Sequence, residues 1–365
     1  MKVSLSKDEL LKGLISVSAA IDPKATHAEL RDVFIEVGEN IVLTGNGVDT
    51  GVRTVIDGNV ETPGVREVEA QFLINVIKKM PDGDIILEAD EETLIIKGGK
   101  AKFKMPCKSG EDFPMLPETE GTTHFTLNGD EFKDLVKQIG FSAVADTGRS
   151  AMKAMEGITF SVKDRTLNAY ALDGMRIAMR NIVIDDNVEM TAIVPALTVK
   201  KIANITSDGE IHFYLNDKYM TVEFDNTTVV LRLIESKPMD ISKFTKMENV
   251  LKVRVEREEL MATLDRTTLM CKEGEKKPVI CEFANNKINI HIVSQHGSMN
   301  EDINAEILGD GIKIGLNPRY VIEALSAIED KIVTLHMNND KSPLFIKDDE
   351  DTYLYLILPV SISEG

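Results

Sequence analysis

The sequence predicts an α+β protein made of three copies of one domain, each with two helices packed on antiparallel sheets. Three observations support this fold class. The chain has 365 residues, which is too long for one ordinary core and enough for two or three domains. One strand-then-helix pattern occurs three times along it. Between the helices, apolar residues alternate with polar ones, as in antiparallel strands that turn one face to a core.

The repeated pattern opens each copy of the domain. Two alternating apolar residues predict a strand, and the following apolar residues at helical spacing predict a helix. The domains are expected over 1–120, 121–247 and 248–365. The matching positions are Val3, Leu5, Glu9, Leu10 and Leu14, then Phe125, Leu127, Glu131, Phe132 and Val136, then Val253, Val255, Glu259, Leu260 and Leu264.

A second helix is predicted later in each copy. Its apolar positions are Leu73, Ile77 and Met80 in the first copy, Ile202 and Ile205 in the second, where the pattern is weaker, and Val321, Leu325 and Ile328 in the third. Alternating runs precede it at 33–37, 157–161 and 279–283, and follow it at 82–88, 208–213 and 330–336. With the polar turns between them, these runs predict about eight short strands in each copy.

The composition indicates a folded protein without a metal-binding signature. Apolar residues make up 43% and charged residues 28% of the chain, which excludes disordered and fibrous classes. Charges among the first ten residues and within every apolar run predict neither an export signal nor a membrane span, so a cytoplasmic protein is expected. Cys107, Cys271 and Cys281 lack metal-ligand spacing, and we interpret them as buried thiols.

The net charge of −18 argues against a nucleic-acid ligand, because a polyanion is attracted by positive surface. The predicted helices change this interpretation. The six segments together carry no net charge: 70–80 and 197–205 are basic, 317–328 is neutral, and 8–17, 129–139 and 256–266 are acidic. A wall of these helices would allow loose phosphate contacts. Sequence-specific readout is not expected, since no helix-turn-helix or zinc-finger pattern occurs.

Several segments resemble the bacterial sliding clamp family, the beta subunits of DNA polymerase III. The resemblance covers the whole chain and is most specific at 112–114, 171–178, 193–195, 317–320 and 356–360. It implies three clamp-type domains in a head-to-tail dimeric ring, with the first domain of one chain against the third of the other. The implied function is a DNA sliding clamp that encircles duplex DNA and tethers the replicative polymerase as a processivity factor, with no active site, no cofactor and no metal.

The implied partners are duplex DNA held without sequence preference, DNA polymerase III subunits, a clamp loader, and other DNA polymerases and repair proteins that bind through short linear peptides. A homodimer is implied, and no membrane. The resemblance makes Lys24 and Arg149 DNA contacts. The basic helix segments add the candidates Lys78, Lys79, Lys200 and Lys201. Gln71 and Leu197 lie near positions where relatives often carry a cation.

The resemblance also implies an apolar pocket between the second and third domains for partner peptides. Asp173 and Gly174 are expected to form a turn that leaves the Arg176 guanidinium beside this pocket, able to donate to a peptide. Methionine suits a surface that accepts different peptides. The pocket residues are Met155, Leu172, Gly174, Met175, Arg176, Ile177, Phe244, Asn317, Tyr320, Pro343, Leu358, Pro359 and Val360.

Two other function classes are compatible with parts of the sequence. An enzyme could use the carboxylates at 82–84, 338–340 and 348–351, but these lie at predicted turns, where Asp, Asn and Gly are favoured for backbone reasons. No phosphate-binding loop or nucleophile elbow occurs. An acidic three-repeat scaffold that binds proteins without encircling DNA would share the exterior and the pocket, and it remains the alternative.

Overall fold

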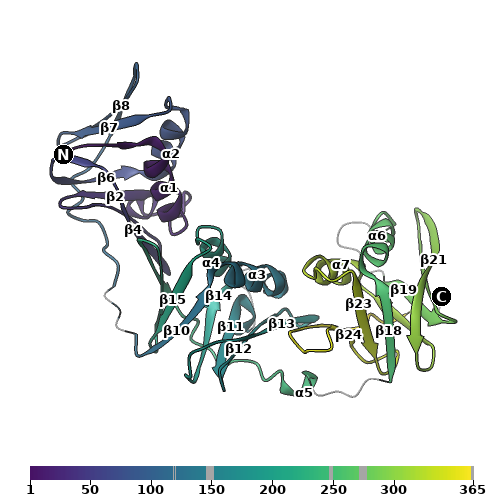
Figure 1. The fold of residues 1–365 in the computed structure, drawn as a ribbon. Helices are drawn as coiled ribbons and strands as arrows, with labels where there is room; N and C mark the ends of the chain where they lie inside the picture. Colours follow the sequence, from purple (N-terminus) through teal and green to yellow (C-terminus); the bar gives the residue numbers. More distant parts are fainter. Residues whose placement is uncertain (118, 120, 145–151, 246–249, 271–277, 363–365) are drawn as a thin grey trace. The chain divides into compact units, whose positions relative to one another are not determined.

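A computed structural model describes residues 1–365 except 118, 120, 145–151, 246–249, 271–277 and 363–365 (Figure 1). The chain divides into two compact units, one of residues 1–133 and 197–235 and the other of residues 134–196 and 236–365. Among the described residues, no helix has both the length and the apolar character needed to cross a bilayer.

The first copy of the repeat forms two helices and nine strands within the part that the structure describes. The helices are α1 (Lys7–Ser18) and α2 (Ala70–Lys79). The strands are β1 (Lys2–Ser6), β2 (Asp32–Val37), β3 (Ile41–Asn46), β4 (Thr50–Ile56), β5 (Asn59–Thr62), β6 (Gly64–Glu69), β7 (Asp84–Ala89), β8 (Thr93–Gly98) and β9 (Ala101–Pro106).

The second copy follows the same order. Its helices are α3 (Gly129–Ile139) and α4 (Ala196–Ala203). Its strands are β10 (Thr123–Asn128), β11 (Gly157–Lys163), β12 (Thr166–Leu172), β13 (Arg176–Val183), β14 (Met190–Pro195), β15 (Glu210–Leu215), β16 (Tyr219–Phe224) and β17 (Thr227–Arg232).

The third copy is preceded by a short helix, α5 (Ser242–Thr245). Its two long helices are α6 (Arg257–Thr268) and α7 (Pro318–Ser326). Its strands are β18 (Leu251–Glu256), β19 (Val279–Ala284), β20 (Lys287–Ser294), β21 (Gly297–Leu308), β22 (Ile312–Leu316), β23 (Ile332–Met337), β24 (Leu344–Lys347) and β25 (Tyr353–Ile357).

Side-chain caps explain where three of the helices begin. The Ser6 hydroxyl accepts a hydrogen bond from the Glu9 amide, 3.1 Å away, at the start of α1. The Glu69 carboxylate accepts from the first amides of α2. Asn317 caps α7 through the Arg319 amide, and Pro318 follows it at the first helical position. The predicted order of strand, then helix, is confirmed in all three copies.

The first unit contains two antiparallel sheets. One has the order β5-β1-β7-β8-β9, and the other the order β10-β15-β16-β17-β4-β3-β2-β6. Strand β17 pairs with β4, Val229 opposite Val52, so the larger sheet contains strands of two copies. Helices α1 and α2 pack on each other (Figure 1), and α1 buries Leu10, Leu14 and Val17 against β3 and β4.

The second unit is built on one twelve-stranded sheet. Its order is β14-β11-β12-β13-β25-β24-β23-β18-β21-β20-β19-β22. Strand β13 pairs with β25, Ile177 opposite Leu356, which joins the second copy to the third. Strand β21 changes partner along its length, from β20 at 297–304 to β18 at 305–308. Helices α6 and α7 pack together (Figure 1).

The predicted fold class of repeated two-helix domains on antiparallel sheets is confirmed. The compact units nevertheless do not coincide with the three predicted domains, because the second copy contributes to both units. The β17–β4 and β13–β25 pairings connect neighbouring copies by the same antiparallel backbone hydrogen bonds that join strands within a copy. The domain limits themselves stay a prediction.

Two of the three cysteines are buried free thiols, as predicted. Cys107 and Cys281 are both buried, and Cys271 lies outside the described residues. Burial raises the pKa of the Cys281 thiol to about 12, so it stays protonated and unreactive near neutral pH. In the described part of the chain, no three His, Cys, Asp or Glu side chains are arranged to hold a metal ion.

Lys108 neutralises two buried carboxylates in the first unit. Its Nζ lies 2.6 Å from Asp32 Oδ2 and 3.0 Å from Glu67 Oε1. The two carboxylate side chains are only 8% and 3% exposed. Desolvation, and then the hydrogen bond to Asp32, raise the pKa of Glu67 above its ordinary value. The folded protein therefore holds the Glu67 proton more tightly, and the stability contributed by this group falls as the pH rises through its folded pKa.

Lys108→Met should destabilise the protein more at pH 8 than at pH 5. Without the ammonium, both carboxylates lack a countercharge when they are ionised. The expected loss in free energy of unfolding is about 2 kcal/mol. This is less than the loss on breaking a fully buried ion pair, because the Lys108 side chain is half exposed. Because the pKa of Glu67 is raised, more of this carboxyl is protonated at pH 5 than at pH 8, which relieves the repulsion. Urea unfolding at both pH values measures this. Lys2→Met, which removes the exposed pair with Glu61, is the control and should change little. Equal losses at both pH values would contradict the prediction.

Candidate peptide-binding site

The turn between β12 and β13 begins the site. Asp173 Oδ1 accepts hydrogen bonds from the amides of Met175, at 2.9 Å, and Arg176, at 3.1 Å. Gly174 has φ +85°, a conformation that glycine adopts without steric cost. The predicted Asp-Gly turn is therefore present. The amide of Leu358 donates to the carbonyl of Met175 at 2.9 Å, which places the segment after β25 beside this turn.

Apolar side chains gather next to the turn in a group that we call the apolar cluster. Its buried members are Tyr170, Leu172, Ile177, Met179, Phe345, Leu354 and Leu356, and Met155, Met239, Ile241 and Leu358 pack against them partly buried. Adjacent strands β12, β13, β25 and β24 supply most of them, because alternate residues of paired strands face the same side. The partly buried members leave apolar surface accessible to a ligand.

Four of the predicted pocket residues are in the apolar cluster: Met155, Leu172, Ile177 and Leu358. Sequence reasoning missed Tyr170, Met179, Leu354 and Leu356, which continue the same alternation on β12, β13 and β25. The alternation of apolar residues with a period of two along these strands is the sequence signal that predicts them. Phe345 becomes a neighbour only through the pairing of β24 with β25, which no local pattern indicates.

The other predicted pocket residues have different surroundings. Phe244 lies in α5 and is 39% exposed. Asn317 caps α7, and the amide of Val360 donates to the carbonyl of Gly315. The residues that the structure does not include in the apolar cluster are Gly174, Met175, Arg176, Phe244, Asn317, Tyr320, Pro343, Pro359 and Val360.

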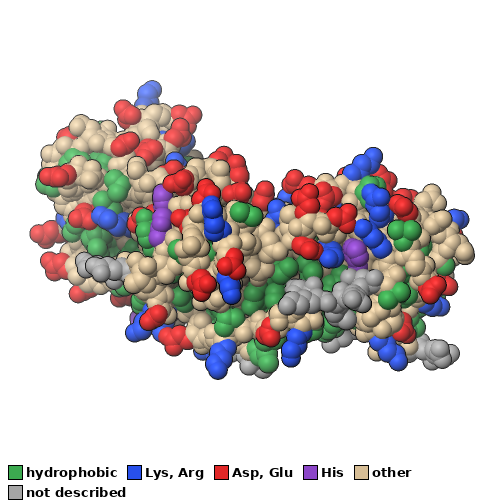
Figure 2. Space-filling view, turned by 60° about the horizontal axis from the view of Figure 1, so that its bottom comes forward, with side chains coloured by type: hydrophobic (Ala, Val, Ile, Leu, Met, Phe, Trp, Pro, Cys, Tyr) green, Lys and Arg blue, Asp and Glu red, His purple; other side chains and the backbone are tan. Residues whose placement is uncertain are grey.

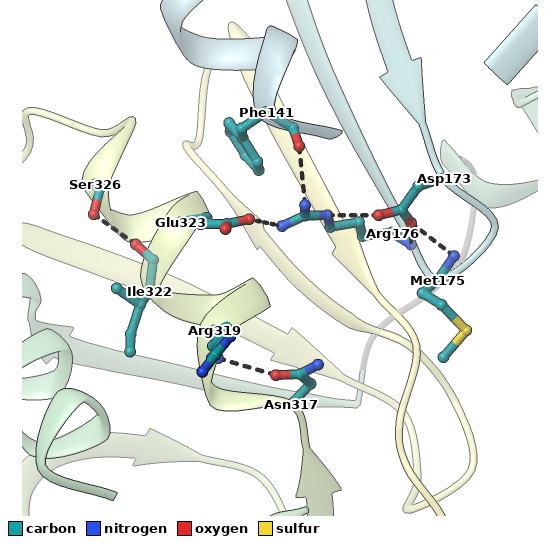
Figure 3. A network of polar contacts seen from close by, with 9 residues as sticks. All are labelled: Phe141, Asp173, Met175, Arg176, Asn317, Arg319, Ile322, Glu323 and Ser326. Atoms are coloured by element: carbon teal, nitrogen blue, oxygen red, sulfur yellow. Dashed lines mark hydrogen bonds and ion pairs between the residues drawn. The ribbon is translucent and has the colours of Figure 1, made fainter. Parts of the chain in front are cut away.

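Arg176 is held by internal contacts on several sides (Figure 3). Its Nε donates to Asp173 Oδ2 at 3.0 Å, its Nη2 donates to the carbonyl of Phe141 at 2.9 Å, and its Nη1 donates to Glu323. The guanidinium carbon also lies 4.4 Å from the centroid of the Tyr320 ring. A planar guanidinium with several donors and two faces satisfies such an environment, whereas an ammonium would not.

These contacts make Arg176 a link between β13 and α7, and so between the second and third copies. Its side chain is only 9% exposed, although the sequence indicated a guanidinium available to a peptide. The difference arises from Glu323 and Phe141, which are far from Arg176 in the sequence and reach it only in the folded unit. A direct contact between Arg176 and a peptide stays a prediction.

The candidate DNA contacts lie at helix ends and in a loop. Lys78 and Lys79 are exposed in the last turn of α2, and Lys24 is exposed in the loop after α1. Lys200 and Lys201 are half-buried in the last turn of α4. Cations are favoured at helix C-termini whether or not they bind a ligand, so position alone does not assign them. Arg149 lies outside the described residues.

The helices also carry exposed neutral and apolar side chains. Phe72 on α2 is 51% exposed and Leu197 on α4 is 60% exposed, while Gln71 contacts Asn75. Figure 2 shows acidic and basic side chains interspersed over one face of the molecule, without a continuous basic field. The face that Figure 2 shows therefore offers no strong attraction to a polyanion.

Comparison with known proteins places the whole chain in one family. The models for the N-terminal, central and C-terminal domains of the DNA polymerase III beta subunit match residues 1–117, 126–238 and 246–361. The beta sliding clamps of Staphylococcus epidermidis and Staphylococcus aureus are 23% identical to this chain, with 99% of each chain covered.

Solved structures of proteins similar to this chain support the same family. The crystal structure of a putative DNA polymerase III beta subunit from Eubacterium rectale is 37% identical, covers 99% of both chains and superposes with a TM-score of 0.93. The DNA polymerase sliding clamp of Bacillus subtilis, 22% identical over the full length of both chains, has the same fold with a TM-score of 0.93. The chain therefore belongs to the family of DNA polymerase III beta subunits, the beta sliding clamps.

Proposed function

We propose that two copies of this chain close head to tail into a ring that encircles duplex DNA and tethers the replicative polymerase to it. The observation that carries this proposal is the match of three beta-subunit domains along the whole chain. The ring would act in the cytoplasm, be placed on DNA by a clamp loader, and also serve other polymerases and repair proteins. The comparisons do not favour a scaffold that stays off DNA.

The ring closes through the free edges of two sheets. Strand β9 is the last strand of the five-stranded sheet, and Lys102, Phe103 and Lys104 are exposed on it. The 297–304 part of β21 pairs with β20 on one side only and carries Glu301 and Asp302. An unpaired edge exposes backbone donors and acceptors that pair readily with another chain. Glu301 and Asp302 pair with Arg266 and Lys287 of their own chain, so it is the unpaired backbone and the exposed Phe103 that favour β9 of one chain beside β21 of the other.

The helices α1, α2, α3, α4, α6 and α7 would face the enclosed DNA, two from each of the domains 1–120, 121–247 and 248–365. Their segments carry no net charge in total, so phosphates would be neither repelled nor held firmly. Lys24, Lys78, Lys79, Lys200 and Lys201 would supply transient phosphate contacts. Such contacts are independent of base sequence and therefore allow the ring to move along DNA.

We propose no catalytic role. Two of the carboxylates that an enzyme would need have structural partners: Asp82 forms an ion pair with Lys7, distant in sequence, and Asp348 accepts hydrogen bonds from the amide and hydroxyl of Thr352. Asn339 Oδ1 accepts from the amide of Lys341 within its turn. The contacts of Asp348 and Asn339 with backbone amides are the ordinary roles of turn residues.

The test of encirclement is topological. The protein is loaded onto nicked circular DNA with a clamp-loading ATPase, freed of unbound protein by gel filtration, and treated with a restriction enzyme that cuts the circle once. A ring remains on the circle and leaves the linear DNA through its ends. Equal retention on circular and linear DNA would overturn the proposal, and so would the absence of retention on the circle.

Leu358→Ala should weaken the binding of a partner peptide about tenfold without altering the dimer. Leu358 is a partly buried member of the apolar cluster, and losing its contact with a peptide removes about 1.5 kcal/mol of apolar burial. Fluorescence anisotropy with a labelled peptide from a DNA polymerase III subunit measures the affinity. Leu197→Ala, an exposed leucine of α4, is the matched control. Equal affinities for the two variants would show that peptides bind elsewhere.

A further inference from the structure

Two histidines lie side by side on the partly exposed face of the eight-stranded sheet in the first unit. His124 is on β10 and His212 is on the adjacent strand β15. The distance between His124 Nε2 and His212 Nδ1 is 3.3 Å, and the two rings are stacked with their centroids 5.5 Å apart. The residues are 88 positions apart in the chain, so no ligand spacing in the sequence indicates this pair.

The backbone that carries the pair is fixed by the core, whereas the histidine rings can rotate. On the other face of the same strands, Phe125 and Phe213 are directly paired and buried, with their ring centroids 4.8 Å apart. The Tyr214 ring stacks on His124 at 4.7 Å. The His212 side chain is 36% exposed, and the last torsion of a histidine side chain has a broad energy minimum. Small rotations can therefore turn both facing nitrogens toward one common point.

Glu210 determines which nitrogen of His212 is available to a ligand. Its Oε1 lies 3.2 Å from His212 Nε2. A carboxylate only accepts hydrogen bonds, so the neutral ring carries its proton on Nε2 and a lone pair on Nδ1, the atom that faces His124. Histidines that bind metals are commonly oriented in this way, by a carboxylate at the ring nitrogen that does not bind the metal.

We propose that His124 and His212 together bind one divalent transition-metal ion of the Zn²⁺ type. Two Zn–N bonds of about 2.0–2.1 Å at a tetrahedral angle hold their nitrogens about 3.3 Å apart, which matches the separation of His124 Nε2 and His212 Nδ1. The ion replaces the hydrogen between these nitrogens, and the His124 proton moves to Nδ1 through solvent, so both rings stay neutral. No third His, Cys, Asp or Glu of the described residues completes the ligand set, so water fills the other positions.

The ion joins an edge strand to its neighbour. Strand β10 is the last strand of the eight-stranded sheet and pairs with β15 alone among the described strands. An ion that binds only the paired arrangement stabilises this pairing by mass action. The metal site therefore acts as a clip on β10, and it depends neither on ring closure nor on peptide binding.

Titration calorimetry with Zn²⁺, on the full chain freed of metal by a chelator, tests the site. Wild type should bind one Zn²⁺ per chain with a dissociation constant on the order of 10 µM, because two of four protein ligands supply about half the binding free energy of a structural zinc site. His124→Gln and His212→Gln should each bind at least about tenfold more weakly. His291→Gln, which changes a half-buried histidine of β20, is the matched control and should bind as wild type does.

Glu210 is a positioning residue in this site, and its variants test the assigned tautomer. Glu210→Ala should weaken Zn²⁺ binding about tenfold, whereas Glu210→Gln should restore it, since the amide oxygen still accepts from His212 Nε2. Zn²⁺ at about ten times its dissociation constant should slow amide hydrogen exchange in β10 about tenfold in wild type and leave it unchanged in His212→Gln.

Two results would overturn the metal site: no binding by wild type up to about 1 mM Zn²⁺, or wild-type affinity in both His124→Gln and His212→Gln. Zn²⁺ binding that leaves hydrogen exchange in β10 unchanged would overturn the clip. Titration with Mg²⁺, which prefers oxygen ligands, should show no binding at this site.

Discussion

Phe103→Asp should convert the dimer into monomers. Phe103 is 40% exposed on the edge strand β9, so the isolated chain should tolerate the change, while the proposed interface should not. Losing the phenyl contact and burying an unpaired carboxylate in the interface costs about 2 kcal/mol at each interface. A two-chain ring contains two such interfaces, so the dissociation constant should rise about a thousandfold.

Light scattering coupled to gel filtration measures this directly, because the mass should fall to the 40.4 kDa of one chain. The matched control is Phe72→Asp, which changes a somewhat more exposed phenylalanine on α2 and should leave the dimer intact. The monomeric variant should also fail to remain on circular DNA. A Phe103→Asp protein that keeps the mass of two chains would show that β9 does not close the ring.

Local patterns predicted the elements well because the information for them lies within a few residues. Alternating Val3 and Leu5 became β1, and the helical spacing of Leu10 and Leu14 became the buried side of α1. The errors lie at helix ends. Ile205 was assigned to a helix, yet α4 ends at Ala203, because the amides of Ile205 and Thr206 both bond to the carbonyl of Ile202 and tighten the last turn.

The candidate site could be predicted only in part. The Asp173 turn follows from local chemistry, and alternation indicates which face of β12 and β13 is apolar. The packing of Leu358 near Ile177 depends on the pairing of β13 with β25, and the partners of Arg176 depend on the position of α7. Neither long-range contact leaves a signal in a single sequence, so the internal role of Arg176 emerged from the structure alone.

The charge of the chain illustrates the same limit. A net charge of −18 describes the whole surface, whereas contact with DNA depends on the part that faces it. The helix segments could be identified from periodicity and their charges summed, which made a neutral wall a prediction from sequence. Which of Lys24, Lys78 and Lys79 approach phosphates depends on the geometry of the ring, which periodicity in a single sequence does not give.

Arg176→Ala should lower the stability of the second unit substantially. The change removes three hydrogen bonds and the contact with the Tyr320 ring, and it leaves Asp173, 18% exposed, and Glu323, 46% exposed, without their cation. Because Glu323 is partly solvated, the expected cost is about 3 kcal/mol, at the low end for a broken buried pair. The unfolding midpoint of this unit should fall by about 5–10 °C.

A double-mutant cycle with Glu323→Gln separates an internal link from a peptide contact. If Arg176 acts through Glu323, the two substitutions together should cost about 1–2 kcal/mol less than the sum of the single effects, measured by calorimetry without any peptide. Arg176→Lys should recover little, because an ammonium cannot reproduce the bonds to Asp173, Glu323 and Phe141 at once. Arg180→Ala, which removes one bond to Thr352, is the control and should cost less.

Peptide affinity separates the two roles that Arg176 could have. Asp173 organises the turn beside Leu358, and Arg176 is the partner of Asp173. Arg176→Ala should therefore weaken peptide binding. Glu323→Gln should weaken it to a smaller extent, although Glu323 is outside the apolar cluster. A direct peptide contact predicts another outcome: weaker binding in Arg176→Ala with an unchanged unfolding midpoint, and no effect of Glu323→Gln. The calorimetric and binding data together therefore assign Arg176 either to the link between β13 and α7 or to the peptide.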